Sequence, residues 1–115
     1  IFKGIDRISI NILEAKKRDF QIDKLEYHVN TPEAIIPLAG DEVILVVAPA
    51  GKLDESKIKA FRIKSGNGVF LNSGVRHFIP YPFKKNINCL VIFKDVTGED
   101  DLTFDQLAES YQILI

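Results

Sequence analysis

Two histidines and two glutamates are the side chains in this 115-residue chain that are best suited to chemistry. Glu26, His28 and Glu33 lie close together in sequence, and His77 is the second of the chain's two histidines. Their nitrogen and oxygen atoms would form a set of four ligands that suits one divalent transition metal. The spacing alone does not show whether these four side chains converge.

Glu26 and His28 lie in a segment that has the pattern of a short β-strand, and the alternation of a strand places them on the same face. Two interpretations are open. Either both side chains face water while Leu25, Tyr27 and Val29 face the core, or both line the interior of a small barrel. In the second case the three apolar side chains would be covered by a partner subunit.

Short strand patterns separated by turn residues run through the whole chain and indicate an all-β protein. The expected strands are residues 7–14, 25–30, 34–38, 42–48, 58–64, 68–72, 77–81, 86–94 and the last five residues. So many short strands are typical of a closed β-barrel or jelly roll, which hides its sheet edges.

Few other local features interrupt this pattern. A helical turn is expected at residues 54–57, and a second at 103–110 with Thr103 as its N-cap. The Asn-Gly pair within residues 65–68 favours a type I′ hairpin, and the acidic residues at 98–101 are expected to form a solvated surface loop.

Composition narrows the class of protein. A net charge of −1 argues against a nucleic-acid partner, and no apolar run approaches the roughly 20 residues needed to cross a membrane. The single cysteine, Cys89, excludes an internal disulfide, fits a reducing cytoplasm, and is expected to be a buried apolar side chain. The length predicts one domain over residues 1–115, and the start at Ile1 is consistent with missing N-terminal residues.

Two of the expected strands are apolar on both faces, namely residues 42–48 and 86–93. A strand that is buried on both sides in a one-domain chain indicates that another protomer covers its outer face. We therefore expect a homodimer.

Two motifs in the chain resemble the cupin motifs. Glu26-x-His28-x4-Glu33-x6-Gly40 is similar to the first motif, and Gly66-x5-Asn72-x-Gly74-x2-His77-x3-Tyr81 is similar to the second. The resemblance implies a small cupin-type β-barrel, or jelly roll, with at most one or two short helical turns. It also implies that the barrel interior holds all four candidate metal ligands, Glu26, His28, Glu33 and His77.

Within the cupins, the ordered segments 25–28, 34–37 and 59–61 resemble the ureidoglycolate lyase family, whose reaction splits ureidoglycolate into glyoxylate and urea. The resemblance implies a small hydroxy-acid substrate that chelates the metal, with His77 or Glu33 as the base if the metal is absent.

The same resemblance implies the groups that bind the substrate. Asn72 and Tyr81 are expected to form hydrogen bonds with it near the barrel mouth. The family usually has cationic side chains near Ile12 and at Ala39, and this chain has neither. Arg62 and Arg76 are the candidates to replace these cations as partners of the substrate carboxylate.

Two other functions stay open. The chain could be a non-catalytic small-molecule-binding cupin, in which the departures at Ile12, Ala39 and Asn72 have removed turnover. It could also be a cupin of different specificity, such as a metal-dependent isomerase that acts on carbohydrates.

Overall fold

The computed structural model describes residues 2–38, 40–64 and 66–115. Its elements are β1 (Ile8–Ala15), β2 (Gln21–Tyr27), β3 (Glu33–Pro37), β4 (Val43–Ala48), η1 (Glu55–Lys57), β5 (Lys59–Ile63), β6 (Val69–Leu71), β7 (Arg76–His77), β8 (Tyr81–Pro82), β9 (Ile87–Lys94), α1 (Thr97–Asp100) and β10 (Thr103–Gln112). Among the described residues the helical elements are two short turns, η1 and α1, in an otherwise β structure. The all-β expectation is confirmed.

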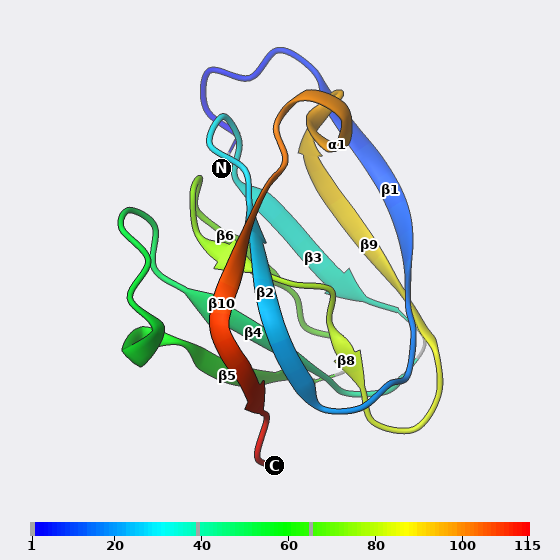
Figure 1. Ribbon diagram of the computed structural model, residues 1–115. Coiled ribbons are helices and arrows are strands. Elements are labelled where there is room, and N and C mark those ends of the chain that lie inside the picture. The colour runs from blue at the N-terminus through cyan, green and yellow to red at the C-terminus, as the bar shows by residue number, and fades with distance from the viewer. Residues whose placement is uncertain (1, 39, 65) are drawn as a thin grey trace.

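Two antiparallel sheets form the two layers of the fold (Figure 1). The first sheet has the strand order β1-β9-β3-β6, and the second has the order β10-β2-β7-β4-β5 with β8 paired to β4. No ladder of strand pairs joins the two sheets among the described residues, so the fold is a jelly roll with open sides and not a closed barrel.

The interior between the sheets is filled by alternate side chains from both layers. Val43 and Leu45 of β4 pack there against Ile35 of β3 and against Cys89 and Val91 of β9. Cys89 is fully buried in this cluster, as expected from the sequence. The close packing of these strands fixes the positions of the polar residues at the end of the interior.

The other face of the second sheet carries a second apolar cluster. Ile44 and Val46 of β4 pack there with Leu25 of β2, and Leu107 and Ile113 close over them. The second face of β4 is therefore covered by the chain's own C-terminal segment, and the interpretation that a partner protomer covers it is wrong for this strand. Leu25 is covered in the same way and needs no partner subunit.

Residues 103–110 form no helix, which contradicts the expectation from the sequence. They belong to β10, which pairs antiparallel with β2 and shifts register between Gln106 and Tyr111. Of the last five residues only Tyr111 and Gln112 lie in this strand. The expected strand at residues 77–81 is also interrupted, because β7 ends at His77 and β8 begins at Tyr81.

Turn predictions had mixed outcomes. The turn at 54–57 is present as η1, and the side chain of Asp54 caps it by accepting a hydrogen bond from the backbone N–H of Ser56. The hairpin expected around residues 65–68 is wrong, because β5 pairs with β4 and β6 pairs with β3 in the other sheet. Ser65 of that turn and Ala39 lie outside the described residues.

A search of the described residues for a helix that is long and apolar enough to cross a membrane finds none.

Candidate active site

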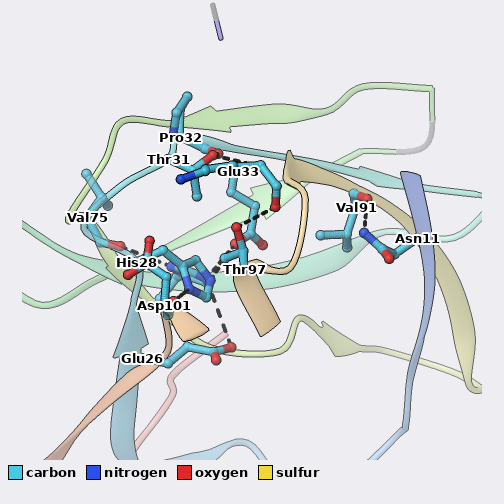
Figure 2. A network of polar contacts seen from close by, with 12 residues as sticks. Asn11, Glu26, His28, Thr31, Pro32, Glu33, Val75, Val91, Thr97 and Asp101 are labelled. Atoms are coloured by element: carbon cyan, nitrogen blue, oxygen red, sulfur yellow. Dashed lines mark hydrogen bonds and ion pairs between the residues drawn. The ribbon is translucent and has the colours of Figure 1, made fainter. Parts of the chain in front are cut away.

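Three of the four candidate ligands converge at one end of the interior. His28 follows β2, His77 lies in β7 beside β2, and Glu33 begins β3 in the opposite sheet. All three side chains are buried, and their ligand atoms lie within 4.8 Å of one another. These three residues are thus brought together by segments from both layers, and Figure 2 shows two of them, His28 and Glu33, with Glu26 nearby.

Oε1 of Glu33 is the centre of this cluster. It lies 2.9 Å from Nε2 of His28 and 3.2 Å from Nε2 of His77. Glu26 stands further away, with its Oε1 4.0 Å from Nε2 of His77. We call His28, Glu33 and His77 the three-residue cluster, and Glu26 is its neighbour on the cavity side.

The other ring nitrogen of each histidine fixes its tautomer. Nδ1 of His28 lies 2.7 Å from the carbonyl oxygen of Asp101, and Nδ1 of His77 lies 3.0 Å from that of Val75. A carbonyl oxygen can only accept, so each Nδ1 must carry the proton. In the neutral form both rings then present a bare Nε2 lone pair toward the carboxylate of Glu33.

Three hydrogen-bond acceptors that face one another in a buried site need either a shared proton or a bound cation between them. Among the described residues, Glu33 Oε1 and His77 Nε2 are buried and have no well-directed hydrogen bond, although their contact is short. The donor set of two imidazoles and one carboxylate suits a divalent transition metal, and backbone carbonyls hold both histidines as they commonly hold metal ligands. The residues present fit such an ion.

The pKa values in the cluster reflect the same mutual attraction of opposite charges. Burial opposes the charge on Glu33, but the contacts from His28 and His77 outweigh it and lower its pKa to about 2. Burial opposes the charge on each histidine as well, yet the contact with Glu33 raises the pKa of both. Glu26 differs, because burial dominates there and raises its pKa.

A cavity of about 350 Å³ opens beside the cluster. Besides Glu26, His28 and Glu33, its lining residues are Asn11, Ile12, Leu13, Ile79, Val91, Phe93, Gly98 and Leu102. The walls are thus chiefly apolar, and the lining contains no arginine or lysine from the described chain. The volume is suited to a small molecule that would reach the three-residue cluster.

Neither arginine expected to bind the substrate lies at this cavity. Arg62 is more than half exposed and pairs with Glu42 at 3.3 Å. Arg76 is buried, but its Nε lies 2.6 Å from Asp105, and its Nη1 donates to the carbonyl of Pro49. Both guanidinium groups are occupied by other partners, and neither faces the cluster.

Tyr81 and Asn72 also lie apart from the cavity lining. The ring of Tyr81 is buried in the second apolar cluster on the other face of the sheet, and its hydroxyl donates to the carbonyl of Gln21. Asn72 is exposed just after β6. The motif spacing could not show that Tyr81 faces the other side of its sheet or that Asn72 lies in the turn after β6.

Two residues at the site were missed by the sequence interpretation. Asn11 lines the cavity, and its amide nitrogen donates to Ser9 Oγ and to the carbonyl of Val91. Asp101 was expected in a solvated loop, but it is buried against His28. Alternation would have placed Asn11 toward water, because it predicts that Ile10 and Ile12 are buried, whereas these isoleucines are exposed and Asn11 lines the cavity. Nothing in the local sequence marks Asp101.

Comparisons with known proteins identify the family. The model of the family described as ureidoglycolate lyase matches residues 3–114. This chain belongs to the ureidoglycolate lyase family. Members of the family with that name include a protein of Pseudomonas savastanoi pv. phaseolicola, 33% identical over 94% of this chain, and one of Burkholderia mallei, 40% identical over 59% of it. The chain spans 63% and 41% of the lengths of these two relatives.

Solved structures show that this family member has the cupin fold. RmlC from Streptococcus suis has a TM-score of 0.62 at 12% identity, covering 77% of this chain and 44% of that one. A 3,4-ketoisomerase from Helicobacter canadensis has a TM-score of 0.61 at 18% identity, covering 83% and 66%. Oxalate oxidase in complex with glycolate has a TM-score of 0.58 at 15% identity, covering 84% and 45%. At such identities the likeness concerns the fold alone.

Proposed function

We propose that this protein cleaves ureidoglycolate to glyoxylate and urea at the cavity beside the three-residue cluster. The observation that carries the proposal is the convergence of two histidine Nε2 atoms on the carboxylate of Glu33. Membership of the ureidoglycolate lyase family over residues 3–114 supports the substrate, and the size of the cavity suits it.

We propose His28, Glu33 and His77 as the residues that would hold one divalent transition metal. A bound divalent cation would attract the hydroxyl and carboxylate oxygens of a hydroxy acid and lower the pKa of the hydroxyl group. Relatives in fold lend support, since oxalate decarboxylase of Bacillus subtilis has Mn(II) centres and oxalate oxidase binds glycolate as a substrate analogue. His77 and Glu33 are catalytic in the sense that they hold this ion.

Glu26 is the residue we assign to proton transfer. Its carboxylate lines the cavity and stands 4.0 Å from His77, outside the three-residue cluster. The reaction removes the α-hydroxyl proton, forms the C=O bond of glyoxylate and breaks the C–N bond. The departing urea nitrogen gains one proton. One carboxylate can therefore take the proton from oxygen and return it to nitrogen with no net change.

The remaining part of the substrate would lie against the apolar walls and Asn11. The amide nitrogen of Asn11 is held by Ser9 and Val91, which leaves its carbonyl oxygen free to accept an N–H of the ureido group. Because the described lining has no arginine or lysine, the substrate carboxylate would rely on the metal centre for its positive charge.

The decisive experiment measures urea and glyoxylate release from ureidoglycolate by metal-reconstituted protein. We expect turnover in the wild type, loss of it in His77→Ala, and no change in the control Arg62→Gln, whose side chain faces away from the cavity. No release with any common divalent metal would contradict the lyase function.

A second function, binding of a small molecule without turnover, is favoured by one observation. The cavity has mainly apolar walls and lacks the cationic side chain that the family resemblance implies near Ile12. Glycolate binding to the metal-loaded protein at an affinity that His77→Ala abolishes, together with no product from ureidoglycolate, would support this function over catalysis.

We further propose that two copies of the chain associate through the outer face of the first sheet. Ile8, Ile10 and Ile12 of β1 are 48%, 66% and 62% exposed. These side chains lie on one face of β1, so the same face of a second copy can pack against them across a two-fold axis. We expect a dimer by light scattering in the wild type and a monomer in Ile10→Lys; a monomeric wild type would contradict the proposal.

Cys89, buried and unpaired, is compatible with a cytoplasmic location.

A further inference from the structure

We propose that Asp101 is the positioning residue that sets the orientation of His28 in the three-residue cluster. Asp101 lies in the segment between α1 and β10, and it is only 8% exposed although it carries a carboxylate. A buried carboxylate is costly unless its oxygens accept hydrogen bonds. Figure 2 shows Asp101 directly beside His28.

Both carboxylate oxygens of Asp101 hold the backbone that follows His28. Oδ1 accepts a hydrogen bond from the backbone N–H of Val29 at 2.9 Å, and Oδ2 accepts one from Asn30 at 2.8 Å. Hydrogen bonds to a charged acceptor are about twice as strong as those between neutral groups. The side chain of Asp101 therefore fastens the start of the loop between β2 and β3.

The backbone of the same residue holds the imidazole ring. The carbonyl oxygen of Asp101 accepts the Nδ1 hydrogen of His28 at 2.7 Å, which directs Nε2 toward Glu33. A histidine ligand is oriented by the group to which its other ring nitrogen donates. Asp101 thus fixes both the backbone and the ring of His28, and a displacement of Asp101 would release both.

His77 has no such dependence on a distant segment. Its Nδ1 donates to the carbonyl of Val75, two positions earlier in the same segment. Asp101 instead lies 73 positions after His28 in the sequence. The orientation of His28 therefore depends on the docking of residues 97–102, and that segment also supplies Gly98 and Leu102 to the cavity wall. Docking of residues 97–102 therefore completes the cavity wall and also orients His28.

The backbone before this segment is consistent with such external support. Val96 has a φ of 57°, a left-handed conformation that is strained for a β-branched residue. A strained conformation of this kind persists where surrounding contacts determine it. The three hydrogen bonds made by Asp101 are contacts that hold the segment in place from its other end.

The test uses Asp101→Ala and the isosteric Asp101→Asn, with Asp100→Asn as the matched control in the same acidic run. The first measurement is the tautomer of each histidine by nitrogen NMR in metal-free protein, at a pH where both rings are neutral. We expect His28 to lose its single Nδ1–H tautomer in Asp101→Ala while His77 keeps it. In Asp101→Asn one hydrogen-bond acceptor is lost, and we expect a partial change.

The second measurement is the affinity for Co²⁺ by competition titration. We expect a loss of about 10- to 100-fold in Asp101→Ala, a smaller loss in Asp101→Asn and none in Asp100→Asn. The inference rests on the proposed use of His28 as a metal ligand, but the NMR measurement needs neither metal nor turnover. A folded Asp101 variant with unchanged His28 tautomer and unchanged Co²⁺ affinity would overturn it. If Asp101→Ala does not fold, Asp101→Asn decides the result alone.

Discussion

Nε2 of His77 lies 3.2 Å from Oε1 of Glu33, and both atoms are buried without a well-directed hydrogen bond. The carboxylate would supply negative charge to a divalent cation held by this cluster. Glu33→Gln keeps the size of the side chain but removes that charge. We expect this substitution to abolish turnover. We also expect it to lower metal affinity by more than the roughly 10- to 100-fold that is typical when a residue hydrogen-bonded to a metal ligand is replaced.

Titration calorimetry with Co²⁺ and a product assay together measure both effects of Glu33→Gln. Thermal unfolding followed by circular dichroism controls for loss of the fold. Near-wild-type affinity in a folded Glu33→Gln protein would show that Glu33 is not a ligand.

Asn11 is predicted to recognise the ureido group. Asn11→Ala removes one neutral hydrogen bond to the substrate, worth on the order of 1 kcal/mol, and we expect KM to rise by roughly fivefold to tenfold. The matched control is Asn88→Ala, an exposed asparagine on β9 that does not line the cavity. Steady-state kinetics on both variants are sufficient, and equal KM values for Asn11→Ala and wild type would remove Asn11 from the substrate site.

The strain at Val96 predicts a stabilising substitution. Asparagine tolerates the left-handed conformation better than valine, and the side chain of Val96 is already 45% exposed, so little burial is lost. We expect Val96→Asn to increase the free energy of unfolding by about 1 kcal/mol. Urea denaturation measures the change, with Val29→Asn as a control at another exposed valine; a destabilised Val96→Asn protein would mean that the strain is not relieved.

Tyr111 and Glu55 give a prediction about pH. The hydroxyl of Tyr111 donates to Glu55 at 2.7 Å, and this bond raises the pKa of Tyr111 to about 12. An ordinary tyrosine has a pKa of about 10. The folded state keeps the proton that the unfolded state loses, so this contact stabilises the fold below about pH 10, and the contribution is lost as the pH rises to about 12.

Ultraviolet absorbance of tyrosinate measures this titration directly. Burial raises the pKa of Tyr81 as well, so the titration is compared between wild type and Glu55→Gln. Glu55→Gln removes the negative acceptor, and we expect the pKa of Tyr111 to move toward its ordinary value. Identical titrations of the two proteins would show that the contact between η1 and β10 does not form in solution.

The strand predictions succeeded where the alternation of polar and apolar residues was regular. They failed where a pairing partner distant in sequence decided the structure. Residues 103–110 contain good helix formers, and the register shift between Gln106 and Tyr111 breaks the period of two that would have marked β10. The Asn-Gly turn gave no hairpin because the strands on its two sides pair in different sheets. Local propensity carries no information about either choice of partner.

The site was predictable in its residue types but not in its surroundings. Alternation left Glu26 and His28 facing either water or the interior, and the choice depended on Leu25, which is covered by Leu107 from the far end of the chain. Arg62 and Arg76 were candidates by charge alone, but each has a carboxylate partner elsewhere. Contacts between distant segments decided all of these outcomes.

The most direct test of the account is the equilibrium binding of Mn²⁺, Co²⁺ or Zn²⁺ to the metal-free protein by titration calorimetry. The convergence of His28, Glu33 and His77 predicts one ion bound per chain, with binding lost in His77→Ala. Absence of binding by the wild type, or the same affinity in His77→Ala, would contradict the claim that these residues form a metal centre.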